Sequence, residues 1–251
     1  MAFHLALYSA SIASVTANLQ LAAVSDVAIA PAGNGFLVNA ALPKLIRAAG
    51  VGNLLNRFQL SSASIRDHTP FDMNPVSVGT VIGAPAPFQD FGDQPIVLSP
   101  NEELDAFVTN SGAGATQTTV GVWFADGPVA PVRGPLFSVH WTAAATLVAH
   151  AWTPTAITLD NGLPSGTFAI VGARFISASG LFARFIPRGG AAWRPGTFAC
   201  QTDAAMLNAK DRYGAMGEWM RFTNTTPPQV EYFALAADTA EEGYIDLIQV
   251  A

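Results

Sequence analysis

The chain has 251 residues, of which 50% are hydrophobic and only 12% are charged, and its formal net charge is −6. Soluble domains usually contain about 25% charged residues, so this scarcity predicts a surface covered largely by copies of the chain itself, or else a secreted β protein with a Ser/Thr/Asn surface. Ten scattered arginines and two lysines exclude the clustered basic surface that direct binding of nucleic acid requires.

Cysteine content and hydropathy indicate whether the chain needs an oxidising compartment, a signal peptide or a membrane. Cys200 is the one cysteine, so the chain holds no internal disulfide and needs no oxidising compartment. Its surroundings favour a small buried hydrophobe over a nucleophile. Met1–Leu21 is apolar but lacks a positive region and is interrupted by serines, which argues against a signal peptide. No stretch approaches the roughly 18 apolar residues of a membrane-spanning helix.

The first fifty residues give different secondary-structure predictions from one segment to the next. From Phe3 to Ile29 the residues are mainly Ala, Ser, Val, Leu and Ile, and both strand and short helix remain open. Pro31–Gly35 predicts a turn, because its Asn-Gly pair readily supplies positive φ. Leu42–Gly50 predicts a short helix, with Pro43 in the first turn and glycine at the end.

Strands dominate the rest of the first half. A strand pair is predicted at Leu54–Ile65, single strands at Pro95–Leu98, Leu104–Thr109 and Thr118–Ala125, and a loop region at His68–Asp93 with one short strand at Val76–Ile82. Gly127–Pro135 contains three prolines and two glycines in nine residues. Such a segment supports neither a helix nor a strand ladder, so it is predicted to be a linker near the midpoint.

The second half continues in the same way. Strands are predicted at Leu136–Trp141, Leu147–Trp152, Ala156–Leu159, Trp219–Thr223, Val230–Leu235 and Tyr244–Val250, and two buried strands with a Ser-Ala-Ser-Gly break at Gly166–Pro187. Asp160–Gly162 predicts a hairpin-type turn, and Asp203–Trp219 predicts a helix. About fourteen to sixteen short strands with two short helices are typical of a sandwich or jelly roll.

Two weak sequence matches predict an internal repeat. Arg57-Phe58 with the following Ser-Ala-Ser resembles Arg174-Phe175 with its Ser-Ala-Ser, and Thr109-Asn110 resembles Thr223-Asn224. The matches are 117 residues apart (57 to 174) and 114 residues apart (109 to 223). Together with the linker they predict an all-β chain of two consecutive jelly-roll β-sandwiches with short helical insertions, residues 1–130 with an amino-terminal arm and residues 131–251.

This architecture resembles the double jelly-roll major capsid proteins of tailless icosahedral viruses. The resemblance covers the whole length but consists of architecture and size, without a matched motif. It implies a viral structural protein that forms homotrimeric, pseudo-hexagonal capsomers of an icosahedral shell. The implied partners are further copies, other virion proteins and often an internal lipid membrane. The implied location is the virion, after synthesis in the host cytoplasm.

Catalytic and ligand-binding patterns are weak in comparison. Asp67-His68 lacks the G-x-S-x-G nucleophile elbow, and the four histidines show no zinc spacing. Glu102-Glu103-Asp105 and Glu241-Glu242 could bind calcium or form a glycosidase pair, but solvated loop charges are the favoured interpretation. No catalytic, cofactor or metal residue is therefore predicted, and the protein is not expected to be an enzyme. A carbohydrate-binding β-sandwich and a glycan-active hydrolase are the alternatives.

Interface residues are predicted in the second half of the chain. Trp193 lies in a Gly/Arg/Pro loop between Arg188 and Arg194, a composition typical of an interface anchor, although a tryptophan folded back over the core is an equal alternative. Arg174 and Arg184, in the strands of Gly166–Pro187, are predicted to be interface or edge arginines.

Overall fold

The computed structural model describes residues 2–52, 55–66, 71–73, 76–77, 89–92, 94–111, 116–127, 132–188, 192–200 and 217–251. The chain divides into two compact units. The N-terminal unit comprises His4–Val81 and Ala86–Pro128, and the C-terminal unit comprises Met1–Phe3, Ile82–Pro85 and Val129–Ala251. The main break, after Pro128, falls within the segment that the sequence predicts to be a linker.

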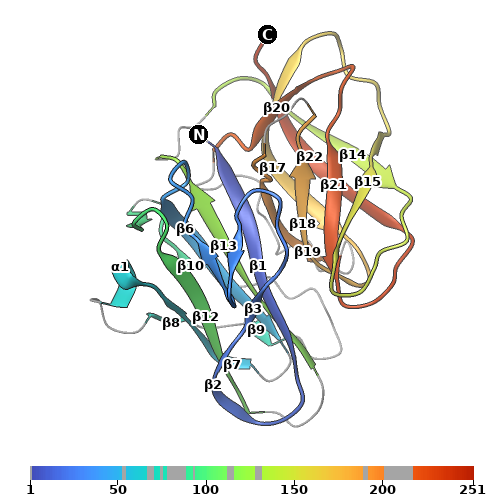
Figure 1. Ribbon diagram of the computed structural model, residues 1–251. Coiled ribbons are helices and arrows are strands. Elements are labelled where there is room, and N and C mark those ends of the chain that lie inside the picture. Colours follow the sequence, from blue (N-terminus) through green and yellow to red (C-terminus); the bar gives the residue numbers. More distant parts are fainter. Residues whose placement is uncertain are drawn as a thin grey trace. The chain divides into compact units, whose positions relative to one another are not determined.

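The N-terminal unit is built from two mostly antiparallel sheets (Figure 1). One sheet contains β1 (Phe3–Ile12), β3 (Ala22–Ala23), β6 (Lys44–Gly52), β9 (Val76–Ser77), β10 (Gln89–Asp90), β11 (Ile96–Val97) and β13 (Thr116–Ala125). The other contains β2 (Thr16–Gln20), β4 (Pro31–Ala32), β5 (Gly35–Leu37), β7 (Leu55–Ser61), β8 (Phe71–Met73) and β12 (Glu103–Asn110). A single turn of helix, α1 (Ala63–Arg66), follows β7.

The C-terminal unit is one nine-stranded sheet that folds over on itself. Its strands are β14 (Leu136–Ala143), β15 (Trp152–Ala156), β16 (Thr158–Leu159), β17 (Thr167–Ile176), β18 (Gly180–Ile186), β19 (Gly196–Cys200), β20 (Met220–Thr223), β21 (Gln229–Ala234) and β22 (Glu241–Gln249). β19 pairs in parallel with β17 and antiparallel with β18. This strand therefore joins the layer that contains β14, β22 and β17 to the layer that contains β15, β21 and β18.

Eight principal strands in each unit follow the same pairing order. One layer joins the first, eighth, third and sixth strands, which are β1, β13, β6 and β10 in the N-terminal unit and β14, β22, β17 and β20 in the C-terminal unit. The other joins the second, seventh, fourth and fifth, which are β2, β12, β7 and β8, and β15, β21, β18 and β19. This is the order of a jelly roll. The predicted all-β fold of two consecutive jelly-roll sandwiches is confirmed.

The strongest strand signal of the sequence forms the centre of the C-terminal unit. Residues 168–173 of β17 and 180–185 of β18 are continuously buried. Phe175 lies at the middle of this core, with its ring centroid 6.1 Å from that of Trp141, 5.1 Å from Phe185 and 5.9 Å from Tyr232. Both faces of these strands are covered, which explains why they lack the apolar–polar alternation of a half-exposed strand.

One predicted helix is a strand. Leu42–Gly50 is not helical, since Lys44–Gly52 forms β6, the third strand of its unit, and every residue from Leu45 to Gly52 is buried. β6 pairs with β13 on one side and with β9, β10 and β11 on the other. The helix prediction relied on proline and glycine as end signals, but burial between two sets of neighbours overrides such local preferences.

Several smaller predictions also need correction. The strand at Leu147–Trp152 is wrong, because β15 begins only at Trp152. The Asp160–Gly162 turn is not a hairpin turn, since β16 pairs with β14 whereas β17 pairs with β19, β20 and β22. The second half of the Leu54–Ile65 strand pair is replaced by α1. Most of the predicted helix at Asp203–Trp219 lies outside the described residues.

The dipeptide matches that suggested a repeat fall on strands with different roles. Arg57-Phe58 lies on β7, the fourth strand, whereas Arg174-Phe175 lies on β17, the third; Thr109-Asn110 ends a seventh strand, whereas Thr223 ends a sixth. Equivalent strands begin 125 residues apart, both for β7 and β18 (55 to 180) and for β13 and β22 (116 to 241). The common strand order is therefore independent of the matched residues.

Gly243 on β22 allows close packing between three strands of the C-terminal unit. A Cβ atom there would lie 2.3 Å from the Arg174 carbonyl oxygen and 2.5 Å from the Trp141 ring. We expect Gly243→Ala to lower the free energy of unfolding by about 1–3 kcal/mol, because backbone and a buried ring must shift. Gly162→Ala is the matched control, since nothing lies within 4 Å of its Cβ position. Urea denaturation would measure both, and equal effects would contradict the tight packing.

Candidate functional site

The five predicted interface residues all belong to the C-terminal unit, but their exposure differs. Arg188 is exposed, Arg174, Trp193 and Arg194 are half-buried, and Arg184 is buried with 1% of its surface exposed. For Arg184 the prediction of an interface or edge arginine needs correction, because its side chain lies in the core of its own unit. The other four remain candidates for contacts between subunits.

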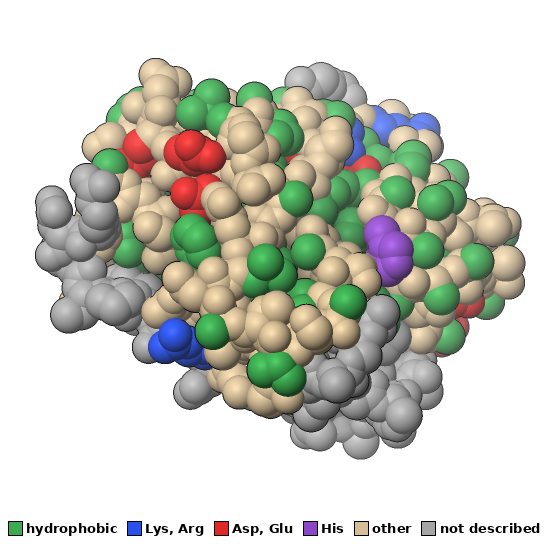
Figure 2. All heavy atoms as spheres, turned by 60° about the horizontal axis from the view of Figure 1, so that its bottom comes forward, with side chains coloured by type: hydrophobic (Ala, Val, Ile, Leu, Met, Phe, Trp, Pro, Cys, Tyr) green, Lys and Arg blue, Asp and Glu red, His purple; other side chains and the backbone are tan. Residues whose placement is uncertain are grey.

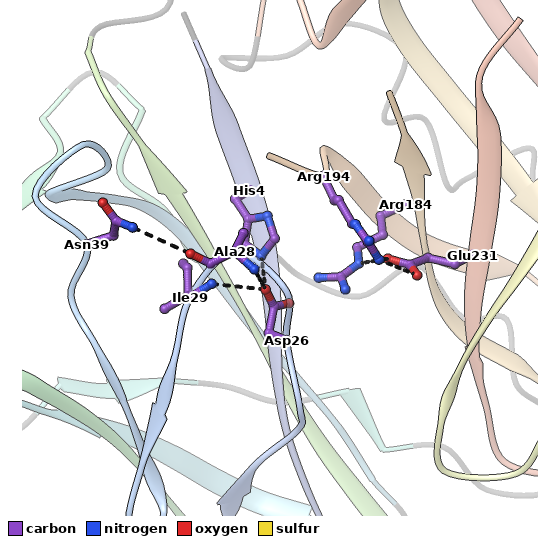
Figure 3. Close-up of polar contacts among 8 residues, drawn as sticks. All are labelled: His4, Asp26, Ala28, Ile29, Asn39, Arg184, Arg194 and Glu231. Carbon is purple, nitrogen blue, oxygen red and sulfur yellow. Dashed lines mark hydrogen bonds and ion pairs between the residues drawn. The ribbon is translucent and has the colours of Figure 1, made fainter. Parts of the chain in front are cut away.

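Arg184 belongs to a buried ionic cluster (Figure 3). Arg184 on β18 lies directly opposite Glu231 on β21, and its Nε donates to Glu231 Oε1. Arg194 approaches the same carboxylate from the loop before β19, with Nη1 2.5 Å from Oε1 and 2.6 Å from Oε2. The Arg184 guanidinium carbon also lies 3.9 Å from the centroid of the Trp152 ring. Hydrogen bonds and a cation–π contact thus replace the water lost on burial.

The ionic cluster positions a predicted anchor. Arg194 directly follows Trp193, so its bond to the buried Glu231 carboxylate restrains the backbone beside the half-buried tryptophan. An aromatic side chain held in place before binding loses less conformational entropy when a partner docks. The core charge cluster and the surface residue are therefore parts of one arrangement, which the sequence analysis did not connect because β18 and β21 are distant in the chain.

A second row of functional groups crosses the layer of β14, β22 and β17. His140, Tyr244 and Arg174 are direct cross-strand neighbours on the face opposite to the buried Trp141 and Ile245. The His140 and Tyr244 ring centroids are 4.9 Å apart, and the Arg174 guanidinium carbon lies 4.8 Å from the Tyr244 centroid. The tyrosine therefore lies between two side chains that can carry positive charge.

Two carboxylates hold the His140 ring. Its Nδ1 lies 2.5 Å from Asp160 Oδ2, and its Nε2 lies 3.3 Å from Glu242 Oε2. Burial alone would lower the pKa of His140, but the hydrogen bonds and negative charges of Asp160 and Glu242 outweigh it and raise the pKa above its ordinary value. Asp160 and Glu242 lie 20 and 102 positions after His140 in the chain, so the sequence pattern did not indicate this cluster.

For Glu241, the first residue of β22, the prediction from the sequence was wrong. It was expected to be a solvated loop charge, yet only 2% of its surface is exposed, and among the described residues neither carboxylate oxygen has a hydrogen-bond partner. Burial raises the pKa of Glu241 to about 7, with Asp238 adding to the shift and the nearby Ser177 hydroxyl opposing it. Alternation along β22 could have revealed this, since Glu241 shares a face with the buried Ile245 and Leu247.

The remaining sequence candidates have structural partners. Glu102 accepts hydrogen bonds from the Ser64 backbone (3.0 Å) and hydroxyl (2.9 Å) and from the Ser99 backbone (3.1 Å). Asp105 accepts from the Gln20 amide at 2.9 Å. These acidic groups therefore hold a turn and a strand edge together.

Burial raises the pKa of Cys200 to about 11, with Arg174 opposing the shift, so this thiol stays protonated at neutral pH.

The histidines are placed separately. His4 is fully buried in the N-terminal unit, with Nε2 3.0 Å from Asp26 Oδ1, which also accepts from the backbone of Ala28 and Ile29 (Figure 3). Sequence reasoning missed this pair. His150 lies in the loop before β15 with a φ of 60°. Asp67-His68 lies outside the described residues. Within the described ranges, no group of three His, Cys, Asp or Glu side chains could hold a metal ion.

Comparisons with known proteins give one distant similarity. No protein-family model and no curated protein matches the chain. Among solved structures, the chain is similar to the crystal structure of the major capsid protein P2 from bacteriophage PM2, with a TM-score of 0.24 and 9% sequence identity over 98% of each chain. At this TM-score the similarity carries no functional argument, so the function is inferred from the strand order and surface of the chain itself. No helix in the described part of the chain is long and apolar enough to cross a membrane.

Because Glu231 is buried between two arginines, we expect even its replacement by the similarly sized glutamine to lower the free energy of unfolding strongly. Glu231→Gln removes the charge that compensates two arginines, one of them 1% exposed. We expect this variant to lose about 3–5 kcal/mol of unfolding free energy, the usual cost of breaking a buried ion pair. Glu218→Gln makes the same chemical change in the exposed Arg221–Glu218 pair and should cost no more than about 1 kcal/mol. Denaturation curves that give similar losses for both variants would contradict the role of the cluster.

The raised pKa of Glu241 predicts that the folded chain becomes less stable as the pH rises. Its pKa is about 7 in the folded chain against 4.5 when solvated, so the folded state holds its proton more tightly. The stabilisation is complete below pH 4.5 and is lost as the pH rises to about 7, by an amount on the order of 3 kcal/mol. Glu241→Gln should abolish this part of the pH dependence, whereas Glu103→Gln, at an exposed position, should keep it. Unfolding curves between these pH values provide the measurement, and an unchanged slope in Glu241→Gln would disprove the assignment.

Proposed function

We propose that the chain is a self-assembling structural subunit, the major capsid protein of an icosahedral virus. The observation that carries the proposal is the repeated strand order, since two consecutive units each place their eight principal strands in the order of a jelly roll. One jelly roll is common to many functions. Two in tandem, each with its own layers, are the arrangement on which the resemblance to double jelly-roll capsid proteins rests.

The proposed mechanism is geometric. Three chains related by a threefold axis bring together six units of the same strand order. Such a ring has a nearly hexagonal outline, which can tile a closed shell. In this proposal the subunit acts without catalysis, in the virion, against further copies, other virion proteins and an internal membrane where one is present.

The surface of the chain supports extensive contact with protein. Figure 2 shows a face on which charged side chains are few and hydrophobic side chains lie among uncharged polar atoms. Among the residues that the structure describes, eight large hydrophobic ones are exposed: Val15, Leu19, Val27, Leu37, Val97, Leu136, Phe137 and Val148. Leu136 and Phe137 are adjacent on β14, and each exposes 41% of its surface. A low density of charged side chains is typical of protein surface that is buried in contacts with other chains.

Measurement of the mass in solution tests the proposal directly. We expect size-exclusion chromatography with light scattering to give three chains of 26.2 kDa each, or larger particles, and electron microscopy to show hexagonal outlines. A stable monomer at high concentration would contradict the proposal. A monomer that also binds on a glycan array would support the carbohydrate-binding alternative instead.

A pair of variants separates assembly from folding. Trp193→Ala should weaken the trimer by about 2 kcal/mol, roughly thirtyfold in its dissociation constant, as expected for an aromatic anchor. Its unfolding curve should be close to that of the unmodified chain, because the side chain is half-buried. Arg221→Ala, at an exposed side chain on β20, is the control and should leave the trimer intact. Equal trimer affinity in both variants would remove Trp193 from the interface.

A further inference from the structure

The sequence Asn-Gly occurs twice in the chain, once in each unit, and the two copies have different surroundings. Asn34-Gly35 connects β4 and β5, and Asn161-Gly162 lies between β16 and β17. An asparagine before glycine is open to attack on its side-chain carbonyl by the following backbone nitrogen, because glycine has no side chain to block the approach. The reaction requires local rotation of the backbone, so the surrounding structure decides whether it occurs.

Asn34-Gly35 is held in place. It belongs to a two-residue hairpin loop closed by the pairing of Ala32 with Gly35. The Asn34 carbonyl accepts a hydrogen bond from Ala23 at 2.8 Å, and its side-chain amide donates to Gln20 at 3.3 Å. Gly35 is buried, and a Cβ atom there would lie 2.6 Å from Asp105 Oδ1. The backbone of this pair can rotate only if the hairpin opens.

Asn161-Gly162 is unrestrained by comparison. Both residues are exposed, and nothing lies within 4 Å of the Gly162 Cβ position. Among the described residues, no hydrogen bond involves the Asn161 side chain or the Gly162 backbone nitrogen. The loop is instead held at its two ends, where the Asp160 nitrogen donates to the His140 carbonyl at 3.1 Å and the Ser165 carbonyl accepts from Gln249 at 3.3 Å. The pair is thus free to rotate within an otherwise folded unit.

We propose that Asn161 is a site of spontaneous deamidation in the folded protein, whereas Asn34 is protected. The Gly162 nitrogen loses its proton and attacks Asn161 Cγ, a ring with two carbonyls (a succinimide) forms, and ammonia leaves. Water then opens either C–N bond of the ring, which gives aspartate or isoaspartate. The net reaction consumes one water and releases one ammonia, and no enzyme or oxidant is required.

The product would carry a new carboxylate beside an existing charge cluster. Asp160 adjoins Asn161, and its carboxylate already lies 2.5 Å from His140 Nδ1. An added negative charge next to this pair favours the protonated imidazole, so the pKa of His140 should rise further. Each modified chain would also be one charge more negative than the −6 of the unmodified chain, which alters the surface in a time-dependent way without any change in the core.

Peptide mass mapping of the intact folded chain, incubated at mildly alkaline pH, tests the proposal. We expect the peptide that contains Asn161 to be converted from amide to acid at least about tenfold faster than the peptide that contains Asn34, because the hairpin must open before Asn34 reacts. The conversion is detected as the mass difference between an amide and an acid. Transfer of methyl groups from S-adenosylmethionine by an isoaspartate-specific methyltransferase should label the same peptide. In guanidinium, where both segments are unfolded, the two rates should become similar.

Two variants complete the test. Gly162→Ala should slow conversion of Asn161 at least about tenfold, because a Cβ hinders the attacking nitrogen, and its open surroundings predict an unchanged unfolding curve. Asn161→Asp should reproduce the raised pKa of His140 in an NMR titration. Equal rates at Asn34 and Asn161 in the folded chain, or an unmodified Asn161 when the unfolded chain reacts readily, would overturn the proposal.

Discussion

The last strand of each unit lies between its first and third strands, and this pairing holds each jelly roll together. In the C-terminal unit β22 pairs along eight residues with β14 and along eight with β17. β14 precedes β22 by about a hundred residues, and the loop between them must be closed before the pairing forms. A unit of this kind is incomplete until its final strand is in place. The steric demand at Gly243 arises at this junction, where Trp141 from the first strand and the Arg174 backbone from the third meet the last.

Charge in the C-terminal core is tolerated in two different ways. Glu231 and Glu241 are equally buried, at 2% exposure each. Glu231 forms ion pairs with Arg184 and Arg194, whereas Glu241 lies near Asp238 and Ser177, and burial raises its pKa to about 7. The difference follows from cross-strand neighbours, not from burial itself. Equal burial therefore accompanies an ion-paired glutamate in one case and a glutamate with a raised pKa in the other.

The sequence was informative where local pattern and tertiary burial agree. β17 and β18 are apolar, β-branched and aromatic, and they are strands in the structure as predicted. β6 has the same burial, but Pro43 before the strand and Gly50 within it resemble helix ends, and its strand character depends on neighbours contributed by residues 89–125. No local pattern contains those neighbours. The fold class was accordingly predictable, whereas the pairing order was not, because it depends on contacts between segments that are distant in the chain.

The candidate site was less predictable than the fold, because its contacts are cross-strand pairs. Arg184 was recognised as an unusual residue, but its partner Glu231 lies 47 positions later, and only the register of β18 with β21 brings them together. The same holds for His140 and Glu242, 102 positions apart. Glu241 is the exception, since simple alternation along its own strand places it on the buried face.

The two units share strand order without sharing chemistry, and this bears on how a shell would use them. Arg184 is the fifth residue of β18, and the fifth residue of the equivalent β7 is Gln59, which lies opposite Phe107. The buried ionic cluster that restrains the Trp193 loop therefore belongs to the C-terminal unit. Three chains around an axis would alternate two kinds of unit with similar outlines and different contact residues. In the proposed trimer, such alternation would let a hexagonal tile keep the shape needed for packing, while side chains of each unit would specify its own interfaces.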